Sequence, residues 1–488
     1  MTDQEIITLV NKDRFSKKKK MARKGVDYYD ARHDILDYRI FFIDADGKLQ
    51  EDVMRHNSRV SHPFFTELTD QEVQYILSGG IEIETDDPEL KEYLKEYFDE
   101  DFVAEVSELL EGTVQKGWDY LVAYRTSENK TRFVHFDSLG IIEIRNGSCD
   151  TTADAFIYYY PVQTESQYPA IRIEYWDKKM TTYYLYQEGK LIKDQNVKIN
   201  PRPHVLYDYG TGYEYEIGTM GYLPLFRLDN NKKQMSGLVP IKDMIDDYDL
   251  MDCGLSNNIQ DTAEGIYVVK GYKGHAKSLD EITYNIKKKK QIAVSEKGDV
   301  DIKTINIPYE ARKQKAEMDE KNIYRFGMGF NSSQIGDGNI TNIVIKSRYF
   351  LLDLKCNKLQ IRLQKLLKQL LEIVIQEINE QHGTSFKVSD AKFVLEREVM
   401  TNAQDNATIE KTEAETKQIV VNTILSIADQ VGDVTVVRLL CEALDLDYDE
   451  IMKELPKQEA ALETVTKTLD EELGNEEERE GSGEVSSE

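Results

Sequence analysis

The polar segment GFNSSQIGDGNIT is the first place in the chain where phosphate chemistry could occur. A phosphate-cradling P-loop carries glycines that let the backbone approach the ligand, and it ends in Gly-Lys followed by Ser or Thr, so that the lysine reaches the phosphates. Here Gly338 is followed by Asn339 and Ile340, and GxxxxGK does not occur anywhere in the sequence. The segment therefore does not predict a nucleotide site.

Other residue combinations that could support catalysis or metal binding are weak. His135 and Asp137 lie close together, but no serine or cysteine in a nucleophile-like motif accompanies them, which favours a structural histidine. The seven histidines and four cysteines show neither metal-ligand spacing nor a CxxC pair. We therefore expect no enzymatic activity, no cofactor and no metal.

Two charged clusters could bind a partner without catalysing a reaction. One is a set of five aspartates within ten residues of helical pattern, where charges of one sign repel one another. Its members are Asp243, Asp246, Asp247, Asp249 and Asp252. The other is a compact run of four lysines, Lys287, Lys288, Lys289 and Lys290. A solvated surface is the simpler interpretation of both clusters, and a functional surface is the alternative.

The bulk composition limits the class of protein. A chain of 488 residues with 31% charged and 40% hydrophobic residues is typical of a globular protein of about three domains. The net charge of −27 argues against a broad grip on nucleic acid, although an acidic wall would let DNA slide past. No apolar run approaches the roughly 20 residues that span a bilayer, and the start, MTDQEIITLV, does not resemble a secretory signal. We expect a cytoplasmic setting with reduced thiols.

Periodicity predicts the elements of the first half. Residues 1–25, which include Lys17–Lys20, are expected to form a loose basic arm. Thr69 with Glu72 forms a capping box that predicts the start of a helix, and a later helical region is expected to end near Gly117. Aromatic and β-branched runs with a period of two then predict an antiparallel sheet between residues 131 and 189.

The second half returns to helical spacing near Ile241. A small two-stranded module with a lysine-rich segment follows, and Pro308 is expected to open a charged helix. After the polar loop, a long helix runs to about Asn379, followed by a strand-like segment and three short helical stretches. The last twenty residues carry nine acidic side chains against one arginine and are expected to be disordered. The predicted fold class is α+β, mainly helical.

The long helix carries an uninterrupted apolar row with alternating spacings of four and three. The row comprises Ile345, Tyr349, Leu352, Cys356, Leu359, Leu363, Leu366, Leu370 and Ile373. This spacing is typical of a coiled-coil seam for another helix, and an ordinary amphipathic core helix is the more common alternative. A basic row on a different face could meet an acidic neighbouring subunit, DNA phosphate or water; it comprises Lys355, Lys358, Arg362 and Lys365.

Three segments resemble a known family when taken in order. The segment GYLPLFRLDNNKKQMSGLVPIKDMIDDYDLMDCGLSNNIQDTAEGIYVV is similar to the central signature of tailed-phage portal proteins, in the group found in phages and prophages of Gram-positive bacteria. The segment GDGNITNIVIKSRYFLLDLKCNKLQIRL resembles the loop and long helix of that family. The segment NSRVSHPFFTELTDQEVQYILSGG resembles its N-terminal region. The resemblance spans roughly Asn57 to Asn379.

The resemblance implies a ring, commonly of about twelve subunits, that forms the DNA channel at one vertex of the phage head. It implies the following parts for this chain: the arm over 1–25, a wing over 26–238, stem helices over 239–264 and 309–329, a clip over 265–308, a tunnel loop over 330–342, a long helix with a return strand over 343–400, a helical crown over 401–468, and the acidic tail over 469–488. A channel position would explain the polar loop between two helices, because such a loop can touch passing phosphate without reading bases.

The resemblance also implies sites and partners. The channel-facing residues would be Asn331, Ser332, Ser333, Gln334, Asn339, Thr341, Asn342, Lys346 and Arg348, with the five aspartates in the first stem helix. Lys287–Lys290 would dock partners on the clip. The implied partners are double-stranded DNA, the terminase large subunit, a head-completion or adaptor protein, and the major capsid and scaffolding proteins. The implied location is the virion, after synthesis in the host cytoplasm. The alternative is a structural adaptor or scaffold protein without a channel.

Overall fold

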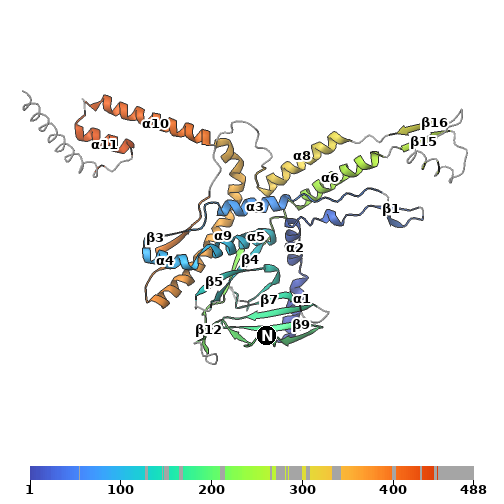
Figure 1. The fold of residues 1–488 in the computed structure, drawn as a ribbon, viewed down its shortest axis with the longest axis horizontal. Helices are drawn as coiled ribbons and strands as arrows, with labels where there is room; N and C mark the ends of the chain where they lie inside the picture. Colours follow the sequence, from blue (N-terminus) through green and yellow to red (C-terminus); the bar gives the residue numbers. More distant parts are fainter. Residues whose placement is uncertain are drawn as a thin grey trace, which may run out of the picture. The chain divides into compact units, whose positions relative to one another are not determined.

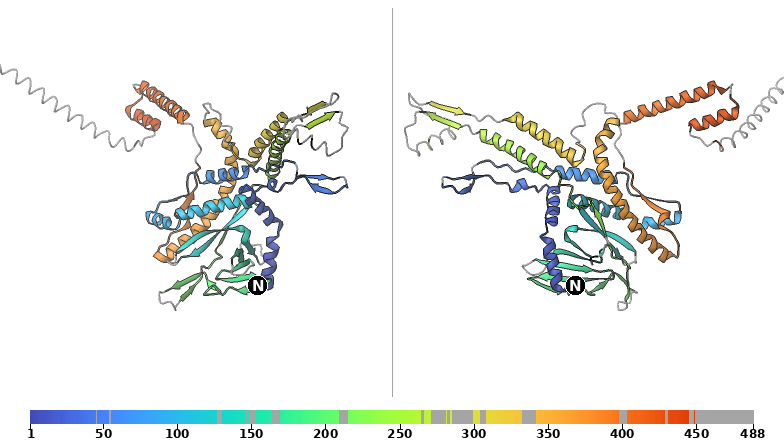
Figure 2. Two further views of the ribbon diagram at one scale, coloured as in Figure 1. Left: turned by 45° about the vertical axis from the view of Figure 1, so that its right-hand side comes forward. Right: turned by 180° about the vertical axis from the view of Figure 1, so that it is seen from behind.

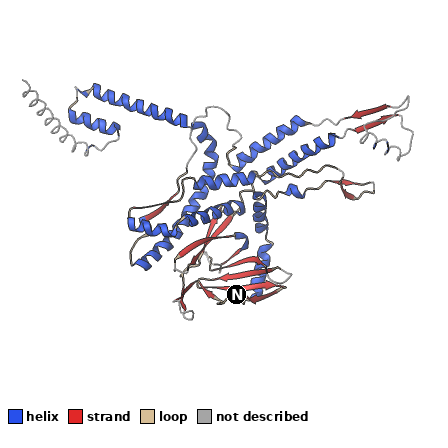
Figure 3. Ribbon diagram, viewed as in Figure 1, coloured by secondary structure: helices blue, strands red, loops and turns tan. Residues whose placement is uncertain are grey.

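A computed structural model describes residues 1–444 and 448, with gaps at 45, 54, 127–129, 146, 148–152, 164–168, 209–214, 264–265, 271–280, 282–283, 285–298, 304–307, 332–341, 398–402 and 429–430. The described residues are mixed helix and sheet, as predicted (Figure 3). The chain divides into two compact units: Met1–Asp337 with Lys346–Val399, and Gly338–Ile345 with Met400–Glu488.

The N-terminal region is helical and partly buried, so the prediction of a loose basic arm is wrong. Helices α1 (Asp3–Arg14) and α2 (Lys17–Tyr29) have side-chain caps at Thr2 and Ser16. Lys19, in the middle of the lysine run, is buried and donates to the carbonyl oxygens of Ser138 and Ile141. The run of four lysines suggested an exposed segment, but the ammonium group of Lys19 has its hydrogen-bond acceptors inside the protein.

Three helices precede the sheets in the chain. They are α3 (Phe64–Leu77), α4 (Pro88–Tyr97) and α5 (Glu100–Lys116). Helix α3 starts five residues before Thr69, and both Thr69 and Glu72 are buried within it, so the expected capping box is wrong. Helix α5 ends at Gly117, which has a φ of 99°, as the sequence predicted. The 3-10 turn η1 (Asp34–Asp37) and the hairpin strands β1 (Phe41–Ile43) and β2 (Leu49–Glu51) precede α3.

The predicted antiparallel sheet is confirmed. Its main body has the strand order β10-β9-β8-β7-β6, in which every pairing is antiparallel. The strands are β6 (Ile141–Ile144), β7 (Ala155–Val162), β8 (Ala170–Trp176), β9 (Met180–Gln187) and β10 (Lys190–Lys193), with β11 (Arg202–Pro203) also paired to β9. The turn η2 (Ser138–Gly140) leads into β6, and strands β12 (Val205–Asp208) and β13 (Tyr215–Gly218) form a separate pair.

A three-stranded sheet and the long helix build the main apolar core. The sheet has the order β14-β4-β5, from β14 (Leu225–Asp229), β4 (Trp118–Arg125) and β5 (Thr131–Phe136). Helix α9 (Asn342–His382) contributes part of the predicted seam to one apolar cluster with residues of α3, α4 and α5; these seam residues are Leu352, Cys356, Leu359, Leu363, Leu366 and Leu370. This part of the seam packs within its own chain, which favours the amphipathic core helix. Strand β17 (Ala391–Val394), after the turn η5 (Val388–Asp390), pairs with β3 (Glu82–Thr85).

Two further helices lie side by side, α6 (Lys242–Ala263) and α8 (Tyr309–Gly327), and Pro308 immediately precedes α8 as predicted (Figures 1 and 2). They lead to the antiparallel strands β15 (Ile266–Lys270) and β16 (Asp299–Lys303). In the second unit, α10 (Ala403–Ser426) and α11 (Asp433–Leu444) account for two of the three expected short helices. The third expected helix and the acidic tail lie outside the described residues.

Candidate functional site

Helix α6 carries the predicted cluster of aspartates, and most of these side chains serve the fold. Asp249 is buried, whereas Asp243 is exposed. Asp246, Asp247 and Asp252 are partly exposed. Cations on the same helix and on other segments offset the repulsion between these carboxylates.

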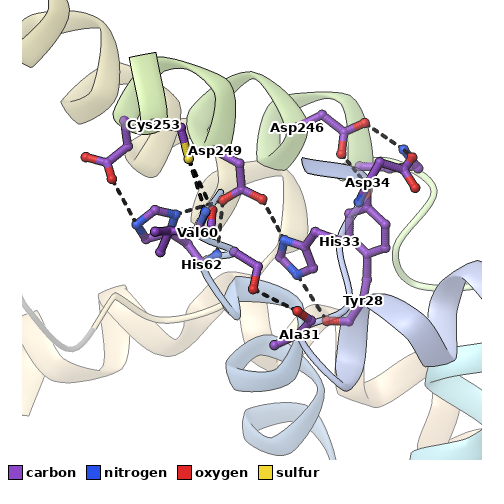
Figure 4. A network of polar contacts seen from close by, with 12 residues as sticks. Tyr28, Ala31, His33, Asp34, Val60, His62, Asp246, Asp249 and Cys253 are labelled. Atoms are coloured by element: carbon purple, nitrogen blue, oxygen red, sulfur yellow. Dashed lines mark hydrogen bonds and ion pairs between the residues drawn. The ribbon is translucent and has the colours of Figure 1, made fainter. Parts of the chain in front are cut away.

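Asp249 is the centre of a buried polar network (Figure 4). Its Oδ2 lies 2.6 Å from Nδ1 of His33, and its Oδ1 lies 2.8 Å from Nδ1 of His62. The same Oδ1 accepts the backbone N–H of His62 at 3.0 Å. Burial alone would raise the pKa of Asp249, but the hydrogen bonds from His33 and His62 lower it below its usual value. Asp249 is therefore not part of a solvated acidic face, which was the simpler interpretation of the cluster.

Both histidines present two nitrogens to acceptors. The Nε2 atom of buried His33 lies 3.2 Å from the carbonyl oxygen of Tyr28. The Nδ1 atom faces the carboxylate of Asp249, so both ring nitrogens of His33 have an oxygen partner. His62 faces Asp249 on one side and has Nε2 3.5 Å from Asp252 on the other. The hydrogen bond to Asp249 raises the pKa of His62, outweighing the effect of its partial burial.

Three side chains spaced four residues apart on α6 hold an extended segment along the helix. Asn257 Oδ1 accepts the backbone N–H of Ser58 at 2.6 Å, and Cys253 Sγ accepts that of Val60 at 3.2 Å. Asp249 accepts the N–H of His62 in the same way. Alternate backbone donors of residues 58–62 thus meet side-chain acceptors on successive turns of the helix.

A second network surrounds Asp246 at the start of α6. Lys242 Nζ donates to Asp246 at 2.6 Å and to Asp34 at 2.7 Å, and Tyr28 also donates to Asp246. Burial opposes ionisation of Asp34, but hydrogen bonds from Lys24 and Lys242 outweigh it and lower the pKa of Asp34 to about 2. Helix α2 and the turn η1 are therefore fastened to the same helix that carries Asp249.

Asp247 serves the pairing of α6 with α8. Lys315 on α8 forms ion pairs with Asp247 and with buried Asp319. This leaves Asp243 and Asp252 as the aspartates of the cluster whose carboxylates have the most access to solvent among the described contacts. The sequence correctly identified an unusual cluster, and in the structure most of these aspartates hold other segments of the chain against α6.

The predicted tunnel-loop residues are described only at the ends of the loop. Asn331 donates to Glu320 of α8 at 2.9 Å. The side-chain amide of Gln71 donates to the carbonyl oxygen of Phe330 and accepts its backbone N–H. Asn342 begins α9, and Lys346 is exposed on its first turns. Arg348 lies in the same helix, but its side chain is outside the described residues. The other predicted loop residues, Ser332, Ser333, Gln334, Asn339 and Thr341, are also outside them, as are Lys287–Lys290.

The remaining sequence candidates have structural roles. His135 Nε2 lies 2.8 Å from buried Asp119, whose carboxylate also pairs with Lys116. Lys355, from the basic row of α9, pairs with buried Glu72 at 2.8 Å. Within the described part of the chain, no cluster of His, Cys, Asp or Glu has the arrangement of a metal site, and no helix is long and apolar enough to cross a membrane.

Sequence reasoning missed the two histidines that meet Asp249. His33 is 216 residues away from Asp249 in the sequence, and His62 is 187 residues away. Neither lies in a local motif, so only the fold could bring them together. A weak signal existed in the aspartate cluster itself, because so many like charges on one helix require cations nearby.

Comparison with known proteins decides the family. The model of the family described as phage portal protein, SPP1 Gp6-like, matches residues 10–463. The chain belongs to this family of phage portal proteins. This confirms the family to which the sequence motifs pointed.

Two portal proteins are similar in sequence. The portal protein of Bacillus phage SPP1 is 28% identical over 336 residues, which cover 68% of this chain and 65% of that protein. The portal protein of Clostridium phage phiCD119 is 23% identical over 401 residues, which cover 78% and 83%. A chain from the solved neck of an empty GTA particle aligns over 78% of this chain and 90% of its own, with 13% identity and a TM-score of 0.38. The family assignment depends on the sequence matches.

Proposed function

We propose that this chain is the portal subunit of a tailed phage or prophage, forming a ring at one vertex of the head through which DNA enters and leaves. The observation that carries this proposal is the family match over residues 10–463. The ring, commonly of about twelve copies in this family, has no catalytic task, and a separate terminase ATPase supplies the energy. The scarcity of catalytic motifs in the sequence is consistent with that role.

The parts of the chain fit the regions of a portal subunit. Helices α6 and α8 form the stem, and the segment with β15 and β16 forms the clip. Residues 330–342 form the tunnel loop, and Lys346 is an exposed cation at its root that can meet passing phosphate. The helices of the second unit form the crown. Support for these assignments comes from the order of the elements along the chain.

The clip is proposed to dock partners outside the head. Lys287–Lys290 would attract an acidic surface of the terminase or of a head-completion protein. Reversing these charges should weaken that association while rings still form.

Electron microscopy of the purified protein in negative stain tests the proposed function. We expect closed rings with a central hole. Particles without a hole, or a well-folded monomer at all concentrations in light scattering, would favour the structural adaptor instead. DNA found in the ring only in samples that also contain terminase and heads would link the channel to packaging.

A further inference from the structure

The hairpin of β1 and β2 is apolar and uncovered. All six of its strand residues are exposed, including Phe41 at 52%, Ile43 at 71% and Leu49 at 68%. The register pairs Phe41 with Glu51 and Ile43 with Leu49, which places these three apolar side chains on one face, while Phe42 lies on the other. An isolated two-stranded hairpin is marginally stable in water. Neither face of this hairpin is buried by the described part of its own chain.

The root of the hairpin, in contrast, is firmly held. His33, which precedes the first leg, and His62, which ends the second leg, both bond to the single carboxylate of Asp249. The legs are also tied to each other, because Asn57 donates to the carbonyl of Tyr38 at 3.0 Å and Asp52 N–H donates to that of Ile40 at 2.8 Å. A rigid root that carries exposed apolar strands indicates a projecting arm with a defined direction (Figures 1 and 2).

The root also fixes the level of the arm along α6. Ser58 bonds to Asn257 and to Gln260, so the second leg lies against the C-terminal half of α6. In a closed ring, neighbouring copies are related by rotation alone about the ring axis. A contact between them therefore joins two different surfaces of the subunit that lie at about the same height along this axis. Among the described residues at this level, Ile259 on α6 is an apolar side chain that is 53% exposed, and Tyr309 on α8 is 50% exposed.

The charges of the two surfaces are complementary. Residues 41–53 of the arm carry four acidic side chains and one lysine, Lys48, for a net charge of −3. Residues 309–316 at the start of α8 carry three cations and one anion, Glu310, for a net charge of +2. Lys315 already pairs with Asp247 and Asp319 of its own chain, so Arg312 and Lys313 are the cations that can meet the arm. Opposite charges at a rim favour the correct partner and orientation. A second copy of this chain therefore offers both the apolar residues and the charge that the arm requires.

We propose that residues 38–56 form an intersubunit arm that lies on the α6–α8 pair of the next copy in the ring, near Ile259 and Tyr309, with Asp249 holding both of its legs. The inference depends on the proposed function, because it requires a ring. It adds a specific contact: the apolar face of Phe41, Ile43 and Leu49 is covered by another subunit. The contact is heterologous, so each subunit donates one arm and receives one.

Photo-crosslinking on intact rings tests this contact. A photoreactive phenylalanine analogue replaces Ile43 in the full chain, and irradiated rings are separated on a denaturing gel. We expect a ladder of covalent dimers and higher species, with crosslinked peptides from residues 242–263 or 309–327. A crosslinked monomer alone, or attachment to any other part of the neighbour, would overturn the proposal. If the unmodified protein forms no rings, the proposed portal function is contradicted, and the contact between subunits is contradicted with it.

A paired substitution gives an independent test. In the F41S/I43S variant we expect the melting temperature of the dissociated subunit to stay unchanged, because both side chains are exposed. The protein concentration for half-assembly should rise on the order of tenfold or more. The matched control is I192S on β10, which also removes an exposed apolar side chain and should leave assembly unchanged. Wild-type assembly of F41S/I43S, or an equal defect in I192S, would contradict the arm.

Discussion

A single carboxylate fastens two segments that are distant in sequence. Asp249 receives hydrogen bonds from His33 and His62, and one of its partners is itself buried. Buried ion pairs contribute little relative to a well-packed apolar alternative, but removing one partner is costly because the other charge is left alone. The substitutions that matter most in this network are therefore those that change Asp249.

We expect D249N to lower the free energy of unfolding by about 3–5 kcal/mol, since it removes the buried carboxylate that bonds to both His33 and His62. Urea denaturation followed by circular dichroism measures the change. The matched control is D243N on the same helix, where the exposed carboxylate should contribute less than about 0.5 kcal/mol. A loss below 1 kcal/mol in D249N would show that the network does not stabilise the fold.

His62 should make stability depend on pH. Its pKa is raised above the usual 6.5 in the folded state, mainly by the hydrogen bond to Asp249. Its contribution is therefore complete below pH 6.5 and is lost as the pH rises through the higher folded pKa. Asp249 has a pKa below the usual 3.8, so its contribution is lost only as the pH falls below that value.

The difference in melting temperature between wild type and H62N should thus be largest near pH 5–6 and should shrink in more alkaline buffer. Asparagine retains a neutral donor, so the comparison isolates the charge of the imidazolium. Melting curves between pH 4.5 and 9 provide the measurement. A difference that stays constant or grows toward alkaline pH would contradict the assigned charge of His62.

At the scale of elements, local signals predicted well wherever one residue decides a boundary. Gly117 ends α5 with a positive φ, and Pro308 precedes α8. The predictions failed where tertiary contacts decide. Lys19 is buried by contacts with the η2–β6 region, and Thr69 lies inside a helix that begins earlier. The apolar seam of α9 was correctly recognised, but its partner is the chain's own core.

Residues 330–342, proposed above as the tunnel loop, form a segment whose removal we expect to spare the fold. Deleting Ser333–Gly338 should leave ring assembly and melting temperature nearly unchanged, because a channel loop contributes few buried contacts. Packaging should suffer, as fewer filled heads or as DNA that slips back out. Counting filled and empty heads measures this effect.

Replacing Lys346 and Arg348 by alanine should add to the packaging defect, and the added defect should depend on salt concentration. Equal losses of stability and packaging after the loop deletion would place the loop between subunits instead. Packaging at the wild-type level would rule out the tunnel-loop assignment.

At the scale of the whole molecule, the net charge of −27 is compatible with a conduit that does not retain DNA. Part of this charge belongs to the last twenty residues, which are rich in acidic side chains and poor in apolar ones. This composition predicts that the segment does not pack onto the fold. Removing the residues after Leu469 should leave the melting temperature and ring formation unchanged. A decrease of several degrees in a thermal scan of the truncated protein would show that the tail packs onto the fold.

The spacing along α6 has a consequence for insertions and deletions. Four residues of helix advance about 6 Å, and two residues of extended chain advance about 6.5 Å. This near match lets Ser58, Val60 and His62 reach Asn257, Cys253 and Asp249 in turn. One residue gained or lost within 58–62 would turn the remaining donors to the opposite side. Length changes are therefore compatible with the fold at the hairpin turn near Gly47, where an epitope tag could be inserted, and incompatible with it within residues 58–62.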